Sequence, residues 1–462
     1  MNIRPTTGDS SWFVHDRFGL FIHWGLYALP ARHEWVKSRE KMSDEQYDLY
    51  FKYFEPDLYD PDQWAQIAYD AGMKYFVITT KHHEGFCLWD SRYTNYKSTQ
   101  APHCRRDLLT PMVKAFRDKG LRVGFYHSLI DWHHPDYWID NRNHPQRDLV
   151  AALGKLDPMI GNVENEPKLS RRDSNPNQGR DQSRYARYLH DQVRELLTEF
   201  GRIDILWFDF SFPPAPGQDR RDFSIGKGRE AWESEKLLAM IRQLQPQVLL
   251  DNRLDLPDLE SSWDFATPEQ AQPLEWVRVN GTRVVWEACQ TFSGSWGYHR
   301  DEQSWRSTDE LIRTLIDCVS KGGNLLLNVG PTGRGEFDAR AIERLKGIGE
   351  WMKRHSRSIY GCTEAPPEFV CPRDCRLTYN PDRQRVYIHL FAYPYKYLHL
   401  EGSFVSRIEY AQFLHDASEI RIGLDSWHAD QIGTADQRIS LNLPQVKPDV
   451  AVPVIEVGLK SS

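Results

Sequence analysis

The chain has 462 residues, of which 40% are hydrophobic and 27% are charged, a composition typical of soluble globular proteins. Its formal net charge of −7 at pH 7 offers no basic field for nucleic acid. No segment approaches the ~20 apolar residues that span a bilayer, and the N-terminal segment lacks the apolar core of a secretory signal. We therefore expect a cytoplasmic protein with no nucleic-acid partner and no membrane anchor.

The aromatic residues and cysteines indicate which kinds of ligand and cross-link to expect. Phe, Trp and Tyr make up 13% of the chain, with 16 Trp, and such rings either fill a core or stack on ligands such as sugars. The seven cysteines are an odd number and are widely spread, which favours reduced thiols over a disulfide framework. Cys371 and Cys375 lie close together, but no second pair completes a zinc site, so we expect no metal.

Apolar runs and helical patterns alternate over the first 355 residues. The runs are short and rich in β-branched or aromatic residues, as in strands of a parallel sheet covered by helices; they span 18–25, 75–83, 121–129, 203–210, 247–253, 282–289 and 324–330. Helical apolar spacing is found at 61–72, 106–119, 183–200, 230–245, 308–321 and 338–355. This alternation predicts a (β/α)8-like barrel over residues 1–355. An open doubly wound sheet is the alternative, and the lack of a Gly-rich turn after the first strand disfavours it.

The pattern changes after the barrel. Residues 356–462 contain short alternating strands separated by Asn-Pro-Asp, Gly and Pro turns, which predicts a C-terminal all-β sandwich. Within the barrel region, residues 154–182 are polar, contain several Gly and Pro, and show no periodicity. They predict a long loop between the third and fourth strands, whose role the sequence leaves open.

Polar side chains gather at the predicted strand ends, where (β/α) barrels place their reactive groups. These ends carry His23-Trp24, His82-His83, Tyr126, Trp207 with Asp209, Asp251-Asn252-Arg253, and Glu287. Imidazoles, arginine and carboxylates bind hydroxyl groups, and indoles cover apolar ring faces. The pattern predicts a polyol-binding pocket. A metal at His82-His83 is disfavoured, because successive strand residues point to opposite faces.

Asp209 is the sharpest catalytic candidate. It follows the apolar run 205–208 and lies between Phe208 and Phe210, where an ionised carboxylate costs several kcal/mol unless it is compensated. A retaining glycosidase needs a second carboxyl as proton donor. Two candidates follow in the chain: Glu269 in the loop FATPEQ, and Glu287, which we place at the end of the sixth predicted strand.

The ordered motifs of residues 12 to about 355 resemble the glycoside hydrolase family 29 α-L-fucosidases. They are FGLFIHWGLYA, TTKHHEGFCLWDS, GFYHSLIDWHHPDY, LWFDF, DNR, WEACQTFSGSWGY and VSKGGNLLLNVGPTGRG. The C-terminal sandwich also resembles the layout of that family. The resemblance implies a retaining hydrolase of terminal α-L-fucose, acting on a fucosylated glycan or fucoside without a metal or organic cofactor.

The resemblance also implies roles for individual residues. Asp209 matches the nucleophile, and Glu269 fits the acid/base better than Glu287, although this chain reads Asp-Asn-Arg where the family pattern is closer to Asn-Asp-Arg. The expected substrate-binding residues are His23, Trp24, Glu34, Trp35, His82, His83, Tyr126, Trp207, Arg253 and Trp296. Among them, the histidines match groups that bind hydroxyls, and Trp296 aligns with an aromatic near the C5 methyl of fucose.

Two alternatives stay open. A retaining barrel glycosidase for another sugar, such as a galactoside of similar hydroxyl pattern, would use the same groups. A catalytically silent carbohydrate-binding protein would not need two carboxylates, so their presence disfavours it. The sequence does not decide the linkage or aglycone preference, and a homo-oligomer is compatible with it.

Overall fold

The N-terminal part of the chain is a barrel of eight parallel strands. The computed structural model describes residues 3–153, 175–423 and 438–460. The strands follow the order β5-β4-β3-β2-β1-β10-β9-β6, and a parallel bridge between Asp251 and Phe265 joins β5 to β6. Their bounds are β1 (Phe18–Ile22), β2 (Tyr75–Lys81), β3 (Arg122–Ser128), β4 (Ile205–Asp209), β5 (Leu249–Leu250), β6 (Phe265–Ala266), β9 (Val285–Thr291) and β10 (Asn324–Val329).

This architecture confirms the predicted (β/α)8-like barrel and the seven predicted strands, most of which are a few residues shorter than expected. The eighth strand, β6, was missed because its two residues lie between the polar Asp264 and Thr267, so no apolar run marks them. A small antiparallel hairpin, β7 (Arg278–Val279) with β8 (Thr282–Arg283), precedes β9. The expected strand 282–289 therefore covers β8 and only the first part of β9.

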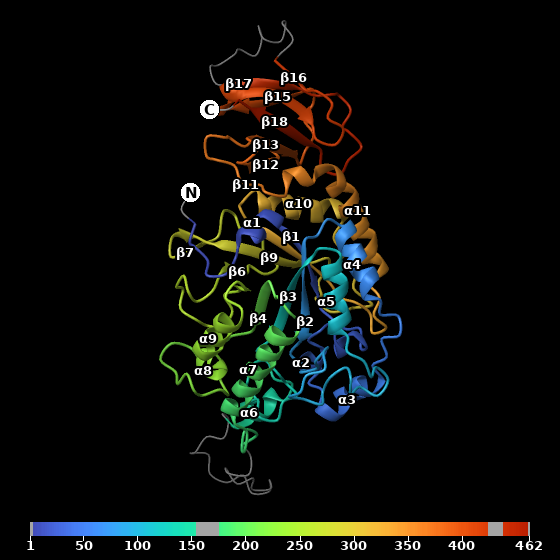
Figure 1. The fold of residues 1–462 in the computed structure, drawn as a ribbon, viewed down its shortest axis with the longest axis vertical. Coiled ribbons are helices and arrows are strands. Elements are labelled where there is room, and N and C mark those ends of the chain that lie inside the picture. The colour runs from blue at the N-terminus through green and yellow to red at the C-terminus, as the bar shows by residue number, and fades with distance from the viewer. Residues whose placement is uncertain (1–2, 154–174, 424–437, 461–462) are drawn as a thin grey trace.

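Helices cover the outside of the barrel (Figure 1). The main ones are α4 (Pro61–Asp70), α5 (Leu109–Asp118), α7 (Gln182–Glu199), α9 (Ser234–Leu244), α10 (Thr308–Val319) and α11 (Ala339–His355). The predicted helix 230–245 is interrupted, because Glu233 has a φ of 49° and separates α8 (Arg229–Trp232) from α9. Short elements occupy the connections: α1 (Ser11–Asp16), η1 (Leu26–Ala28), α2 (Val36–Arg39), α3 (Asp44–Tyr53) and α6 (Arg147–Leu153).

Two apolar layers hold the barrel together. One lies between the strands and the surrounding helices. The other fills the interior of the barrel and is rich in rings, including Phe21, Tyr75, Tyr126, Trp207 and Phe265. Strands buried on both faces explain why the barrel strands are continuous apolar runs in the sequence.

The C-terminal part is an antiparallel sandwich, as predicted. One sheet has the order β11-β12-β13-β18-β15 and the other the order β14-β17-β16. The strands are β11 (Thr363–Glu364), β12 (Cys375–Asn380), β13 (Arg385–Leu390), β14 (Tyr397–Glu401), β15 (Ile408–Phe413), β16 (Arg421–Ile422), β17 (Arg438–Asn442) and β18 (Val454–Leu459). Two short 3-10 helices, η2 (Ser356–Ser358) and η3 (Ser403–Arg407), accompany them. Side chains from both sheets share one apolar core.

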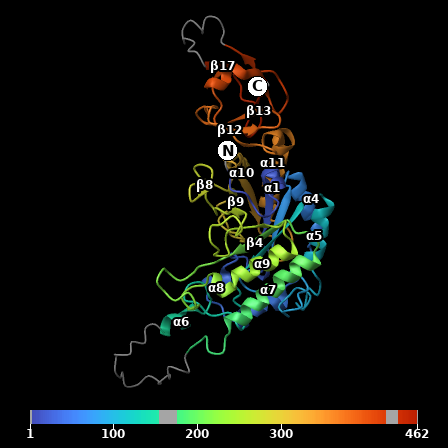
Figure 2. The same cartoon turned by 60° about the vertical axis from the view of Figure 1, so that its left-hand side comes forward.

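The sandwich lies against α10 and α11, at the end of the barrel where the strands begin. Arg376 of β12 pairs with Asp317 of α10 at 2.7 Å, and the indole Nε1 of Trp351 on α11 donates to the carbonyl of Val452 at 3.0 Å. The helices α2 and α3, which follow β1, lie towards the opposite end of the molecule (Figure 1). Figure 2 shows the sandwich and the barrel from another side, with α10 and α11 between them. The carboxyl ends of the barrel strands therefore face away from the sandwich.

Three further findings bear on the expectations from the sequence. No helix in the described ranges is long and apolar enough to cross a membrane. All seven cysteines are free thiols, and no three His, Cys, Asp or Glu side chains of the described residues are grouped to hold a metal ion. Residues 154–174 of the predicted loop 154–182 lie outside the described residues.

Candidate functional site

Asp209 is the last residue of β4, at the carboxyl end of the barrel, and its side chain is 12% exposed. Three groups surround its carboxylate. The hydroxyl of Tyr126 donates to Oδ2 at 2.9 Å, Nη1 of Arg253 donates to Oδ1 at 2.8 Å, and Nε2 of His83 lies 3.8 Å from Oδ2. The hydrogen bonds from Tyr126 and Arg253 are of the charge-assisted kind that stabilises and orients an ionised carboxylate inside a protein.

Arg253 connects Asp209 to Glu269. Its Nη2 donates to Oε2 of Glu269 at 2.8 Å, while Nε donates to the hydroxyl of Thr267 at 2.9 Å. Burial lowers the pKa of Arg253, but the negative charges nearby, that of Asp209 above all, outweigh burial and raise it. The Glu269 side chain is 41% exposed, so the two carboxylates lie at different depths: Asp209 at the floor of the site and Glu269 nearer its rim.

The three predicted histidines lie beside this pair. The ring of His82 is 5.5 Å from that of His23 and 4.0 Å from that of His83. Nδ1 of His23 is 2.6 Å from Oδ1 of Asn328, and Nδ1 of His83 is 2.6 Å from the hydroxyl of Ser128. Oδ1 of Asn328 can only accept a hydrogen bond, and the Ser128 hydroxyl donates its own hydrogen to the carbonyl of Ile130. Both imidazoles are therefore assigned the tautomer that carries hydrogen on Nδ1.

Burial, reinforced by the neighbouring His82, lowers the pKa of both His23 and His83 well below 6.5. Both imidazoles are therefore neutral at pH 7, and each keeps an unprotonated Nε2. A neutral imidazole nitrogen without hydrogen accepts a hydrogen bond from a hydroxyl group. The two rings therefore offer acceptor atoms that suit the hydroxyls of a polyol.

Two loops complete the wall of the site. Oε2 of the buried Glu34 accepts hydrogen bonds from the backbone N–H groups of Trp296 at 3.2 Å and Gly297 at 2.8 Å, so it ties the loop after β1 to the loop after β9. The ring of Trp296 lies 5.1 Å from that of His23. The ring of Trp35 lies 4.9 Å from that of His83. Burial raises the pKa of Glu34.

Trp24 does not lie with the other predicted residues. It is fully enclosed between strand and helix, its ring centroid lies 5.1 Å from both Tyr59 and Trp64, and its Nε1 donates to the carbonyl of Thr332. Neighbouring residues of an extended segment point to opposite sides. Since His23 points into the barrel, Trp24 points outward into the helical layer, and its expected place in the pocket was wrong.

Glu287 also lies elsewhere than expected. The strand β9 continues to Thr291, so Glu287 is its third residue rather than its end. It pairs in register with Asn324, the first residue of β10, and it is completely buried. Burial raises its pKa to about 8. Glu287 therefore lies in the lower part of the barrel interior, below the strand ends that carry Asp209.

Three residues of the site were not predicted. Asn328 and Ser128 fix the tautomers of the two histidines. Phe210 packs its ring 5.0 Å from that of Trp35 and has a φ of 77°, a left-handed conformation that a bulky residue rarely adopts. Ser128 ends an apolar run and Asn328 interrupts one, and a polar residue at such a place was a signal that could have been used. Nothing in the sequence indicates the left-handed backbone conformation of Phe210.

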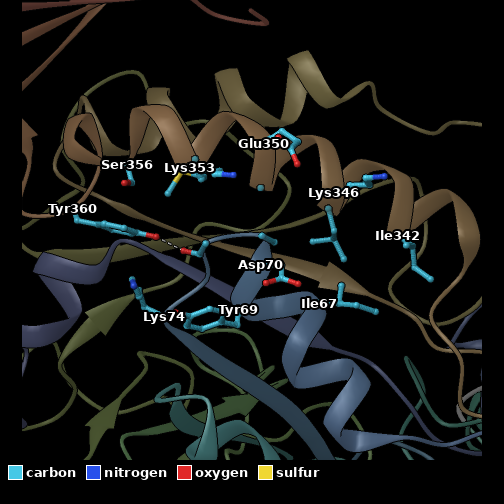
Figure 3. A pocket seen from close by; sticks show the side chains of 15 residues that line it. Ile67, Tyr69, Asp70, Lys74, Ile342, Lys346, Glu350, Lys353, Ser356 and Tyr360 are labelled. Atoms are coloured by element: carbon cyan, nitrogen blue, oxygen red, sulfur yellow. Dashed lines mark hydrogen bonds between the residues drawn. The ribbon is translucent and has the colours of Figure 1, made fainter. Parts of the chain in front are cut away.

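A groove of about 740 Å³ lies on the outer flank of the barrel, between α4 and α11 (Figure 3). Tyr69 and Ile342 are partly exposed there, and Lys346 and Glu350 line it from α11. The groove is formed by helices and contains none of the predicted site residues. It is therefore distinct from the carboxylate pair at the strand ends.

Comparisons with known proteins show the family of this chain. A family model described as alpha-L-fucosidase matches residues 5–357. Plasma alpha-L-fucosidase from Homo sapiens is 28% identical over 415 residues, which cover 83% of this chain and 76% of that protein. The solved structure of alpha-L-fucosidase isoenzyme 1 from Paenibacillus thiaminolyticus is 40% identical, with a TM-score of 0.84 over 98% of this chain and 99% of that chain. An alpha-L-fucosidase of glycoside hydrolase family 29 from Bacteroides thetaiotaomicron is 27% identical, with a TM-score of 0.78 over 100% and 97% of the two chains.

Proposed function

Because this chain belongs to the α-L-fucosidases of glycoside hydrolase family 29, we propose that it hydrolyses terminal α-L-fucosides with retention of configuration, with Asp209 as nucleophile and Glu269 as acid/base. The family makes the chain a glycoside hydrolase and implies a fucosylated glycan as substrate. The residue roles and the stereochemical course are the proposal.

The observation that carries the proposal is the position of Arg253 between the two carboxylates. One guanidinium binds Asp209 and Glu269 at 2.8 Å each. Retaining glycosidases keep their two carboxyl groups about 5–5.5 Å apart, one on either side of the scissile bond. A single planar group bound to both carboxylates holds them in the same small region, as this geometry needs.

The proposed reaction has two steps. In the first, Asp209 attacks the anomeric carbon, the bond to the leaving oxygen breaks, and Glu269 gives that oxygen a proton. In the second, Glu269 takes a proton from water, which attacks the same carbon and releases Asp209. Tyr126 and Arg253 would stabilise the carboxylate of Asp209 before the ester forms and after it breaks.

Two related structures support a covalent intermediate. One is described as a trapped covalent intermediate of an alpha-L-fucosidase from Bacteroides thetaiotaomicron with 2-fluoro-fucosyl fluoride, obtained with a Glu-to-Gln mutant. Another is an alpha-fucosidase from Thermotoga maritima in complex with a mechanism-based inhibitor. This chain is 27% and 25% identical to these two proteins.

The remaining pocket residues would select the sugar. The unprotonated Nε2 atoms of His23 and His83 would accept hydrogen bonds from sugar hydroxyls. The indole of Trp296 would cover the C5 methyl, which distinguishes fucose from galactose and gains from apolar contact. This arrangement favours a fucoside over the galactoside alternative. Hydrolysis of 4-nitrophenyl α-L-fucoside faster than the matching galactoside supports it, and equal rates contradict it.

The nucleophile is tested with Asp209→Gly and 4-nitrophenyl α-L-fucoside. We expect a loss of about 10³-fold or more in kcat, because attack on the anomeric carbon then lacks its nucleophile. Sodium azide should restore turnover and give the fucosyl azide of inverted configuration. Near-normal turnover without azide would rule out Asp209, and would leave the family assignment intact.

The acid/base is tested with Glu269→Ala on two substrates. A 4-nitrophenyl leaving group needs little protonation and a phenyl group needs more, so we expect the activity loss to be much larger on the phenyl fucoside. Azide should intercept the ester on Asp209 and give the fucosyl azide of retained configuration. The exposed Glu275→Ala is the matched control. Equal losses on the two substrates would contradict the role of Glu269.

A further inference from the structure

Glu287 is a carboxyl inside the apolar interior of the barrel that the proposed mechanism does not use. It is completely buried among the rings and aliphatic side chains that fill the barrel. Removing a polar group from water in this way costs free energy unless hydrogen bonds replace the lost solvation. The hydrogen bonds that Glu287 makes therefore indicate what it does.

Tyr75 fixes Glu287 from one side. The hydroxyl of Tyr75 donates to Oε2 of Glu287 at 2.5 Å. Asn324 donates from Nδ2 to the same hydroxyl at 3.3 Å and to the carbonyl of Phe13 at 2.8 Å. The three side chains come from β2, β9 and β10, so three strands determine the orientation of one carboxyl.

Trp207 lies on the other side. Its indole N–H stabilises the charged form of Glu287. Neither Nε1 of Trp207 nor Oε1 of Glu287 has a hydrogen bond shorter than 3.5 Å to any described residue. Since the Trp207 side chain acts on the Glu287 carboxyl, we take its indole N–H as the polar partner of Oε1 in this otherwise apolar surrounding.

The ring of Trp207 in turn supports the catalytic groups. The guanidinium carbon of Arg253 lies 4.4 Å above its centroid, and the ring of Tyr126 stacks on it with centroids 5.6 Å apart and planes at 24°. Both Arg253 and Tyr126 bind Asp209 directly. A rotation of the Trp207 indole would therefore move both hydrogen-bond donors of the proposed nucleophile.

We propose that Glu287 is a positioning residue of this pocket: held by Tyr75, its carboxyl fixes the plane of Trp207 and, through that ring, the places of Arg253 and Tyr126 beside Asp209. The inference rests on the proposed role of Asp209. It assigns Glu287 no contact with substrate.

The test is a double-mutant cycle with Glu287→Met and Trp207→Phe, measured as kcat and KM on 4-nitrophenyl α-L-fucoside. Glu287→Met keeps the volume and removes the polar contact, and we expect kcat to fall about 10-fold to 30-fold with KM within threefold, because small misplacements of catalytic groups slow the chemistry. In the Trp207→Phe background the same change should cost less than threefold, since the indole N–H is gone. Glu287→Gln, which is neutral and keeps hydrogen-bonding groups, should stay within about threefold of wild type in kcat.

Three results would overturn the inference. One is a Glu287→Met variant with the kcat of wild type. Another is a loss of the same size in both backgrounds, because Glu287 would then act independently of Trp207. The third is a loss that is larger on phenyl than on 4-nitrophenyl fucoside, which would make Glu287 a proton donor and displace Glu269. These results do not depend on whether Asp209 is the nucleophile, because the azide experiment on Asp209→Gly tests that assignment separately.

A folded variant is needed in each case. If Glu287→Met fails to fold, Tyr75→Phe provides the same test, because it removes the hydroxyl that fixes the carboxyl and keeps the shape of the ring. We expect kcat to fall about threefold or more in Tyr75→Phe, with this loss reduced in the Trp207→Phe background. An unchanged kcat in Tyr75→Phe would contradict the inference.

Discussion

Nη1 of Arg253 lies 2.8 Å from Oδ1 of Asp209. Arg253 comes three residues after β5, and its guanidinium packs on the indole of Trp207. Its Nη2 binds Glu269. The two carboxylates are therefore held in place by one guanidinium before a substrate binds. Arginine suits this place because its planar fork offers two donors in fixed directions, which a lysine ammonium does not.

Arg253→Lys should therefore keep the positive charge but lose the simultaneous contacts with Asp209, Glu269 and Trp207. One ammonium cannot bind Asp209 and Glu269 in the same geometry and stack on Trp207, so we expect kcat/KM on 4-nitrophenyl α-L-fucoside to fall about 10-fold to 100-fold. The control is Arg220→Lys, at an arginine that also binds two carboxylates, Glu230 and Asp255, outside the site. Activity of Arg253→Lys within twofold of the control would show that charge alone suffices.

Tyr126→Phe removes one hydrogen bond from Asp209. A hydrogen bond to a charged group contributes about 1.5–3 kcal/mol, so we expect kcat/KM to fall about 10-fold to 100-fold. Tyr137→Phe is the matched control, because Tyr137 is equally buried and its hydroxyl has no hydrogen-bond partner among the described residues. Steady-state kinetics of both variants check this. Equal activities in the two variants would show that the Tyr126 hydroxyl does not assist Asp209.

The fold could be predicted from the sequence to the extent that strands and helices leave periodic patterns. Strands buried on both faces gave seven continuous apolar runs, and exposed helices gave amphipathic spacing. The strand β6 has two residues and left no pattern. The break at Glu233 arises from one left-handed backbone conformation in a segment whose side chains favour a helix on both sides.

The site was harder to predict, because the sequence shows which residues end a strand but not where their side chains point. His23 and Trp24 are neighbours in the chain, yet one faces the barrel interior and the other the helical layer. The position of Glu287 was predicted wrongly for another reason. The strand continues through the polar Gln290 to Thr291, so Glu287 lies inside it and not at its end. Arg253, by contrast, was recognised as a pocket residue from its motif. Its contact with both carboxylates could be seen only in the folded structure.

Trp24 and Trp296 should respond to substitution in opposite ways. Trp24→Phe opens space in the packed helical layer, so we expect a loss of about 1–3 kcal/mol in stability and little change in kcat/KM. Trp296→Ala removes an apolar wall of the proposed sugar pocket, so we expect KM for 4-nitrophenyl α-L-fucoside to rise about 10-fold to 100-fold. Thermal unfolding and kinetics of the two variants check this, and a raised KM in Trp24→Phe would restore Trp24 to the pocket.

Glu287 makes the stability of the barrel depend on pH with a definite sign. Burial raises its pKa from an ordinary 4.5 to about 8. Between these values the folded chain keeps a proton that the unfolded chain releases. The contribution of Glu287 to stability is therefore complete below pH 4.5, and it is lost as the pH rises towards 8, by about 1.4 kcal/mol per pH unit.

Glu287→Gln cannot ionise and removes this dependence. We expect the free energy of unfolding of wild type to fall relative to that of Glu287→Gln as the pH rises from 5 to 8, measured by urea denaturation. Tryptophan fluorescence reports on the barrel, because Trp427 alone of the 16 Trp lies beyond residue 355. The other ionisable groups around the carboxyl, Tyr75, Cys289 and Arg17, are present in both proteins. The difference between the two curves therefore isolates Glu287. Curves that stay parallel over this range would show that Glu287 is already ionised in the folded chain.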